Sequence, residues 1–204
     1  MIDFSLYLIT DRQRTAGRPL AEVVKAALSG GVRAVQLREK DLPAAELYEL
    51  AWELRELTAS YDARLFINDR IDIALAVEAD GVQLGISSLP VTAARRIAPK
   101  LLIGYSSHSK KEAAAALAKG ADFVTFSPVF FTPSKASFGA PQGVEKLTAS
   151  CAELGDAVFA LGGIKLDNLP LVLAAGCRKV AVIGAILEAD DPAEAAEAFR
   201  KTLS

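Results

Sequence analysis

The chain has 204 residues, of which 51% are hydrophobic and 24% charged, a globular composition with enough length for one sizeable core. Its formal net charge of -2 gives no electrostatic reason to expect nucleic acid or a membrane surface as a partner. The N-terminus lacks the basic and apolar regions of a signal peptide, and no apolar run is long enough to span a bilayer. We therefore expect a soluble cytoplasmic protein with no nucleic-acid or membrane partner.

Short apolar runs alternate along the chain with longer stretches of helical period. The expected strands are Leu6–Thr10, Ala34–Arg38, Leu65–Asn68, Gly81–Leu84, Leu101–Ser106, Phe123–Ser127, Val158–Leu161 and Lys179–Ile183. The expected helices span residues 19–29, 43–59, 70–78, 90–98, 110–119, 143–154, 167–175 and 192–203. Strands that are almost continuously apolar are typical of a parallel sheet buried on both faces.

A closed barrel and an open doubly wound sheet both fit this alternation. Eight units within about 200 residues favour closure, so we predict an α/β fold, a single (β/α)8 TIM barrel. No linker or change of composition divides the chain, and residues 1–204 are expected to form one domain. Cys151 and Cys177 are too few for a disulfide framework and lack metal-ligand spacing, so both are expected to be thiols packed in or near a helix.

Nearly every predicted strand ends in polar residues, and ligands of such barrels bind at that end. Gln36 lies inside an apolar strand, and Arg38 and Lys40 follow at alternate positions, so the three side chains should point the same way. A buried amide needs a hydrogen-bond partner. One amide beside two cations suits a heterocycle that carries a phosphate or diphosphate. The alternative is a salt bridge from the cations to Glu39 or Asp41.

Two further strand ends carry groups capable of chemistry. Asp69 follows Asn68 and could hold Mg²⁺ together with ligand phosphates, although by itself capping of the next helix is the simpler interpretation. His108, the only histidine, lies in a Ser-rich loop and could transfer protons near neutral pH. A lone histidine can equally be structural.

The last three strands are followed by loops suited to phosphate. Gly162, Gly163 and Gly184 are placed to bind phosphate through backbone N–H groups, or else they form tight turns. The polar segment Thr132–Gly139, which contains Lys135, is of the kind that often forms a mobile lid.

In their order and spacing, these segments resemble the thiamine phosphate synthase/thiazole tautomerase family over essentially the whole chain. No single segment is specific for the family, but the whole set in this order is. The matching segments are Tyr7–Arg12, Val35–Lys40, Ile67–Asp69, Asp80–Gly85, Gly104–His108, Gly120–Val124, Ser127–Phe130, Thr132–Lys135, Gly143, Leu161–Ile164 and Ile183–Ile186.

The resemblance implies a transferase of thiamine biosynthesis. Hydroxymethylpyrimidine diphosphate loses pyrophosphate, and the nitrogen of a thiazole phosphate captures the pyrimidine cation. Fixed cations and Mg²⁺ would stabilise the leaving group. On the pyrimidine diphosphate side the family's motif matches Gln36, Arg38, Lys40, Asn68, Asp69 as the Mg²⁺ ligand, Ser106 and Lys135. On the thiazole phosphate side it matches Thr132, Ser134, Gly163, Ile183 and Gly184.

One departure from the family's pattern concerns the metal. Ser88 stands where synthases carry an aspartate that is a second Mg²⁺ ligand, and serine is a poor replacement for it. The tautomerase branch, an isomerase that aromatises a thiazole phosphate precursor, needs no such metal and uses a histidine in the loop of His108. The retained charged positions favour the synthase, which is the function we expect.

Two alternatives stay open beside the synthase. One is the tautomerase, with His108 as its acid/base. The other is a non-catalytic binder of thiazole or thiamine phosphates, because a shared fold does not fix the chemistry. In every case the expected ligands are small phosphorylated heterocycles, and a homodimer is compatible with the sequence.

Overall fold

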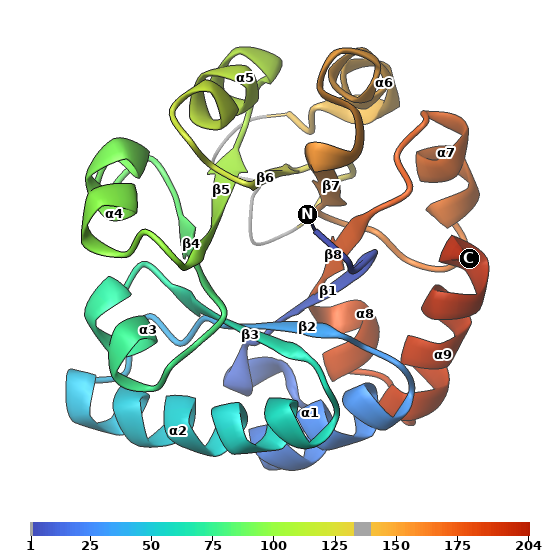
Figure 1. The fold of residues 1–204 in the computed structure, drawn as a ribbon. Helices are drawn as coiled ribbons and strands as arrows, with labels where there is room; N and C mark the ends of the chain where they lie inside the picture. The colour runs from blue at the N-terminus through green and yellow to red at the C-terminus, as the bar shows by residue number, and fades with distance from the viewer. Residues whose placement is uncertain (1, 133–139) are drawn as a thin grey trace.

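The computed structural model describes residues 2–132 and 140–204, and in it eight parallel strands close into a barrel in chain order (Figure 1). The strands are β1 (Leu6–Ile9), β2 (Ala34–Leu37), β3 (Arg64–Asn68), β4 (Gly81–Leu84), β5 (Leu102–Ser107), β6 (Phe123–Phe126), β7 (Val158–Leu161) and β8 (Val180–Val182). Pairing of β8 with β1 closes the ring, with Leu6 opposite Val180. The predicted (β/α)8 barrel is therefore confirmed, and the open doubly wound sheet is excluded.

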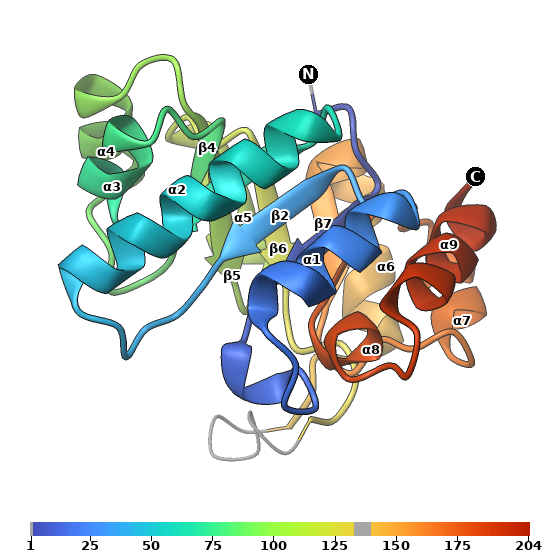
Figure 2. The ribbon, with the colours of Figure 1, turned by 90° about the horizontal axis from the view of Figure 1, so that it is seen from below.

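Helices surround the barrel on all sides (Figures 1 and 2). They are α1 (Leu20–Ser29), α2 (Ala44–Ser60), α3 (Ile71–Ala76), α4 (Val91–Ile97), α5 (Lys110–Ala118), α6 (Gly143–Leu154), α7 (Leu169–Ala174), α8 (Gly184–Leu187) and α9 (Pro192–Leu203). Every predicted helix and strand is present within two residues of its predicted ends; the sequence missed α8 and the 3-10 turns η1 (Arg12–Arg14) and η3 (Gly155–Ala157). In the described part of the chain, no helix has both the length and the apolar character to cross a membrane.

The interior of the barrel is filled at its N-terminal half by five aromatic side chains, which we call the aromatic floor: Phe4, Tyr7, Phe66, Phe123 and Phe159. Nine of their ten pairs have ring centroids between 5.1 and 6.0 Å apart, and all nine are edge-to-face or tilted. No helix residue belongs to this cluster, because the helices pack on the outer faces of the strands in a separate core. Such packing of bulky residues makes the barrel a solid core rather than a pore.

Two glycines on neighbouring strands make room for this floor. A Cβ atom at Gly81 would overlap the ring of Phe66, and one at Gly104 would lie 2.5 Å from the ring of Phe123. Both glycines lie on strands and have ordinary strand backbone, so glycine is needed at these positions because it has no side chain and not because of its flexibility. The large rings of β3 and β6 are therefore matched by empty positions on β4 and β5.

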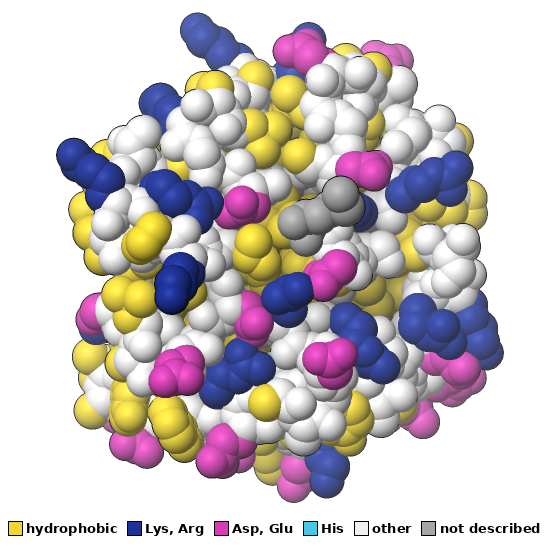
Figure 3. Space-filling model, in the orientation of Figure 1, with side chains coloured by type: hydrophobic (Ala, Val, Ile, Leu, Met, Phe, Trp, Pro, Cys, Tyr) yellow, Lys and Arg dark blue, Asp and Glu magenta, His cyan; other side chains and the backbone are white. Residues whose placement is uncertain are grey.

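Ion pairs between neighbouring elements join the face of the barrel that carries the N-terminus, and Figure 3 shows acidic and basic side chains interspersed over this face. Asp122 accepts hydrogen bonds from the backbone N–H of Ile103 and from the guanidinium of Arg95, both at 2.7 Å. Asp80 repeats this arrangement with Arg55, two strands earlier. These carboxylates satisfy strand N–H groups that the sheet leaves unpaired.

Both cysteines are buried free thiols, as the sequence predicted. Cys151 lies on α6, and the thiol of Cys177 donates to the carbonyl oxygen of Lys179 at 3.2 Å.

Candidate active site

The strands run parallel, so their C-terminal ends share one end of the barrel, opposite the N-terminus (Figure 2), and the described polar residues that follow the strands lie at that end. They lie one layer above the aromatic floor. Ser106 follows Gly104 by two residues, and Thr125 follows Phe123 in the same way, so each pair points into the barrel. The interior thus changes from aromatic to polar as it approaches the mouth.

A chain of hydrogen bonds crosses the barrel in this layer; we call it the polar chain, and it joins Gln36, Tyr7, Gln83 and Ser106. The Nε2 of Gln36 donates to the hydroxyl of Tyr7 at 3.1 Å, and that hydroxyl donates to the Oε1 of Gln83 at 3.4 Å. The Nε2 of Gln83 then donates to the Oγ of Ser106 at 3.1 Å. Burial raises the pKa of Tyr7 far above its ordinary value, so the phenol stays protonated and remains a donor.

The polar chain supplies the partner that buried Gln36 was predicted to need. It also fixes the amide, because its nitrogen is committed to Tyr7 and its oxygen is left as an acceptor. Thr125, in register with Ser106 on β6, is 1% exposed, and its hydroxyl has no hydrogen-bond partner among the described residues. This part of the interior therefore holds one more polar group than the protein itself satisfies.

The carboxylate of Glu39, just past β2, is buried and fully bonded. It accepts from the hydroxyl of Thr10 at 2.6 Å, from the backbone N–H of Arg12 at 3.1 and 3.2 Å, and from the Arg12 guanidinium at 3.2 Å. The same guanidinium makes two bonds to Asp41, at 2.6 and 2.8 Å. Arg12 thus holds both acids of the loop between β2 and α2, a bidentate geometry suited to arginine.

The two cations that alternate with these acids, Arg38 and Lys40, are not paired in this way. The side chains of Arg38 and Lys40 make no ion pair or hydrogen bond with other residues in the described ranges. The alternative of a salt bridge from either cation to Glu39 or Asp41 was wrong, because Arg12 occupies both carboxylates. That Arg38, one residue past β2, lies on the same side as Gln36 stays a prediction from the alternation of the strand.

Asp69 departs from ordinary backbone geometry at the end of β3. Its φ is +65°, a left-handed conformation that is uncommon for a residue other than glycine. The interpretation of Asp69 as a helix cap was wrong, since α3 starts after Arg70 and has no side-chain cap. Its exposed carboxylate has no partner among the described residues, and Asn68 beside it is in register with Gln83. Strained backbone of this kind is concentrated at functional sites.

His108 lies at the same end of the barrel, in the loop between β5 and α5. Its backbone N–H donates to Glu112 at 2.7 Å, and its Nδ1 lies 3.8 Å from that carboxylate. The ring is 39% exposed, so the loop holds His108 at the rim rather than in the interior.

The loops after β7 and β8 pack tightly without any ligand. A Cβ atom at Gly162 would lie 2.7 Å from Pro128, and one at Gly163 would lie 2.8 Å from Phe130. Both glycines have positive φ angles, 100° and 67°. Close packing against the start of the loop after β6 is thus sufficient to explain glycine at both positions, and phosphate binding there stays a prediction.

In the loop after β8, another side chain also comes close to a glycine. Ile183 caps α8, and a Cβ atom at Gly184 would overlap the guanidinium of Arg14. Arg14 in turn pairs with Glu188 at 2.6 Å. The structure therefore brings a cation against the predicted phosphate loop, although that cation already has an acidic partner.

Some predicted site residues lie outside the described residues. These are Ser134 and Lys135, together with the rest of the predicted lid up to Gly139. Thr132, at the edge of the described part, has a buried hydroxyl that lacks a partner among the described residues.

A family model described as thiamine monophosphate synthase matches residues 6–186. The chain belongs to the thiamine monophosphate synthase family. A relative from Geobacter sulfurreducens, a putative thiamine-phosphate synthase, is 57% identical over 97% of this chain and 93% of its own length. The thiamine-phosphate synthase of Moorella thermoacetica is 42% identical over 100% of this chain and 98% of its own. The solved structure of thiamine phosphate pyrophosphorylase from Pyrococcus furiosus superposes with a TM-score of 0.90 at 43% identity, covering 98% of this chain and 95% of that one.

These comparisons confirm the family resemblance that the sequence motifs indicated. No three His, Cys, Asp or Glu side chains among residues 2–132 and 140–204 gather into a cluster that could hold an ion. Mg²⁺ is commonly held by one or two carboxylates together with substrate phosphates and water, so a single free carboxylate at Asp69 fits this chemistry. Ser88 has a local role instead, accepting from the backbone N–H of Gly85 at 2.8 Å.

Sequence reasoning missed several residues of this family member's site, chiefly Tyr7, Gln83, Thr125 and Arg12. Gln83 and Thr125 carried a usable signal, because each is a polar residue inside an apolar strand, as Gln36 is. Tyr7 and Arg12 did not, since a tyrosine in a strand and an arginine in a loop are ordinary.

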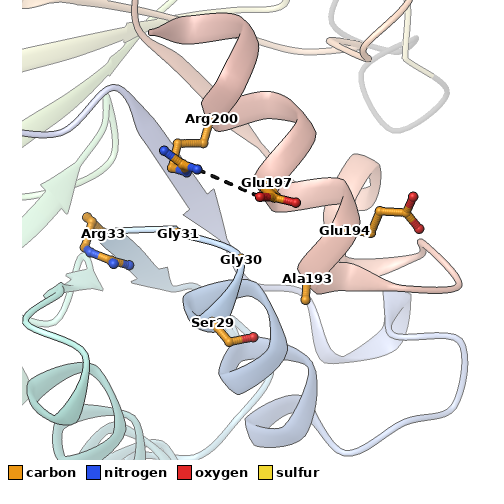
Figure 4. Close-up of a pocket in the computed structure, with 8 residues that line it drawn as sticks. All are labelled: Ser29, Gly30, Gly31, Arg33, Ala193, Glu194, Glu197 and Arg200. Carbon is orange, nitrogen blue, oxygen red and sulfur yellow. Dashed lines mark ion pairs between the residues drawn. The ribbon is translucent and has the colours of Figure 1, made fainter.

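A hollow also lies near the other end of the molecule, away from the strand ends that carry the candidate site. A cavity of about 570 Å³ opens between the end of α1 and α9 (Figure 4). Arg33 and Arg200 line it together with Glu194 and Glu197, the last of which pairs with Arg200 at 4.0 Å. Mixed charge at the N-terminal face selects no ion of one sign, and ligands of these barrels bind at the opposite end.

Proposed function

We propose that this chain is a thiamine-phosphate synthase, a transferase that joins hydroxymethylpyrimidine diphosphate to a thiazole phosphate and releases pyrophosphate. The observation that carries the proposal is the arrangement on β2, where a fixed amide at Gln36 precedes two cations, Arg38 and Lys40, whose neighbouring acids are held by Arg12. The names of the full-length relatives support the same reaction.

The chain's own residues account for two parts of this reaction. The free Oε1 of Gln36 is placed to accept from the amino group of an aminopyrimidine, which would orient the ring at the mouth. Arg38 and Lys40, with Lys135 implied by the family's motif, would stabilise the negative charge that builds on the departing pyrophosphate. Ser106, which receives the end of the polar chain, keeps its own hydroxyl hydrogen to donate to a ligand.

Mg²⁺, when bound, would add positive charge to the diphosphate oxygens. Asp69 would hold it, because its carboxylate is exposed at the correct end of the barrel and serves no cap or ion pair among the described residues. On the thiazole phosphate side we propose Thr132, Ser134, Gly163, Ile183 and Gly184.

The test is turnover by the purified full chain. Hydroxymethylpyrimidine diphosphate and thiazole phosphate are supplied with Mg²⁺ or with a chelator, and thiamine phosphate and pyrophosphate are measured together. We expect both products in equal amounts, and only when Mg²⁺ is present. Folded protein, verified by circular dichroism, that releases neither product would refute the synthase.

Ser88 and His108 favour a second candidate, the thiazole tautomerase, because the second carboxylate is missing while a histidine lies at the same rim. The same preparation is given the thiazole phosphate carboxylate precursor, with His108→Ala as the comparison. Aromatised product that disappears in His108→Ala, without any thiamine phosphate from the synthase substrates, would assign the tautomerase. A melting temperature raised by thiazole phosphate, without turnover of either kind, would assign a binder.

Restoring a carboxylate at position 88 tests the metal assignment. Ser88→Asp is expected to lower the Mg²⁺ concentration for half-maximal turnover by about tenfold, because a second hard oxygen ligand would then share the ion with Asp69. An aspartate oxygen can accept from Gly85 as the serine hydroxyl does, so the loop should be retained. Ser87→Asp, which adds the same charge at the neighbouring exposed position, is the control. Equal shifts in both variants would show a general effect of charge and no ligand at position 88.

A further inference from the structure

The loop between β2 and α2 has alternating charges at its start. Arg38, Glu39, Lys40 and Asp41 together carry no net charge, although a site for a diphosphate requires a positive one. Carboxylates beside these cations would compete with a diphosphate for them and would also repel it. Arg12, from the loop after β1, supplies the missing positive charge to the two acids.

The two acids depend on the Arg12 side chain to different degrees. Glu39 is 5% exposed, and it keeps two partners that do not depend on the arginine side chain: the Thr10 hydroxyl and the backbone N–H of Arg12. Asp41 is exposed, and its remaining hydrogen bond is a long one of 3.3 Å from Gln13. The Arg12 guanidinium holds the pKa of Asp41 below its ordinary value. Loss of the Arg12 side chain would therefore leave Asp41 charged and unpaired beside Lys40.

The orientation of the loop depends on the same contacts. The hydroxyl of Thr10 accepts from the backbone N–H of Arg38 at 2.9 Å while donating to Glu39, so β1 and β2 are locked just where Arg38 leaves the strand. Glu39 therefore points away from the barrel axis. Arg38 is left on the side of Gln36, by the alternation of the strand.

We propose that Arg12 is a positioning residue: it pairs with Glu39 and Asp41 so that Arg38 and Lys40 stay available to the diphosphate. This inference deepens the proposed function, because it takes a diphosphate as the ligand of the two cations. Arg12 touches neither the ligand nor the reacting atoms; its effect comes through the acids that it neutralises.

Inorganic pyrophosphate is the probe, and its binding to the full chain is measured by calorimetry in the presence of Mg²⁺. Arg12→Ala is expected to raise the Kd for pyrophosphate about tenfold, because Asp41 without its arginine partner would compete with pyrophosphate for the cations and repel it. The second variant, Arg12→Gln, retains a donor for Glu39 but no charge, and should weaken binding similarly. Arg64→Ala is the matched control, since Arg64 forms a bidentate pair with Asp3, at 2.6 and 2.8 Å, at the opposite end of the barrel. It should leave the Kd within about twofold.

A double variant distinguishes the proposed neutralisation of Asp41 by Arg12 from a purely structural role of Arg12. If freed Asp41 is the competitor, Arg12→Ala combined with Asp41→Asn should recover most of the lost affinity, about fivefold relative to Arg12→Ala alone. A structural defect in the loop would not be relieved by removing a second side chain. Thiazole phosphate binding, measured in the same variants, should not change.

The outcomes are distinct from those of the function test. Recovery in the double variant supports the inference even if the wild-type chain shows no turnover, because binding is measured without the reaction. A double variant that binds as weakly as Arg12→Ala would overturn it, as would wild-type affinity in both Arg12 variants. Failure of the wild-type chain to bind pyrophosphate would overturn it as well.

Discussion

Asp69→Asn is expected to lower turnover of the two synthase substrates by about a thousandfold, equivalent to about 4 kcal/mol of transition-state stabilisation. The carboxylate follows the end of β3 and has no partner among the described residues, so it is available as an anionic ligand. Asparagine has nearly the same shape and also tolerates the left-handed backbone, with φ of +65° at this position, so the fold and the strain should both be kept. What is lost is the charge that would bind Mg²⁺.

The measurement is kcat/KM over a range of Mg²⁺ concentrations, with Asp62→Asn as the matched control. Asp62 is also an exposed aspartate with a left-handed backbone, φ of +52°, but it lies at the N-terminal face. Asp62→Asn should turn over substrate at the wild-type rate. Wild-type kcat/KM in Asp69→Asn at every Mg²⁺ concentration would remove Asp69 from the metal site.

Phe123→Ala is expected to lower the free energy of unfolding by about 4 kcal/mol, because it removes the ring at the centre of the aromatic floor. The centroid of this ring lies 5.1 Å from that of Phe159 and 5.5 Å from that of Phe66, and the side chain is fully buried. Surrounding strands are held by the closed barrel and cannot collapse into the cavity. Urea denaturation followed by circular dichroism measures the change.

The matched control for this stability prediction is Phe131→Ala. Phe131 is 66% exposed, so removal of the same number of atoms should change the free energy of unfolding by no more than about 0.5 kcal/mol. Similar losses in the two variants would mean that the aromatic floor contributes no more than a surface ring.

The alternation of strands and helices could be predicted because each element shows its own local pattern of apolar residues. The apolar runs of β4 and β7 have their predicted ends, and Asp191 caps α9 through its bonds to Ala193 and Glu194, as an Asp-Pro start indicates. The short helix α8 was missed because four residues after a Gly are too few to show a period.

The candidate site was predictable in its location but not in its pairing. Proximity in sequence left open a salt bridge from Arg38 or Lys40 to Glu39 or Asp41, whereas the partner of both acids is Arg12, which comes close only because β1 lies beside β2. The role of Asp69 was ambiguous for a different reason. Asp69 would cap α3 if that helix began at residue 70, but α3 begins at Ile71, which leaves the carboxylate free. Sequence patterns do not predict the first residue of a helix so closely.

Tyr7 belongs to both layers of the barrel interior, because its ring packs in the aromatic floor and its hydroxyl carries the polar chain. Elsewhere the two layers use different side chains from the same strands, two residues apart, as with Phe123 and Thr125. During evolution, the residues at the mouth could therefore be exchanged for a new substrate while the packing beneath them was inherited unchanged. Tyr7 would be the residue least free to vary, since every replacement except phenylalanine alters both the ring packing and the hydrogen bonds.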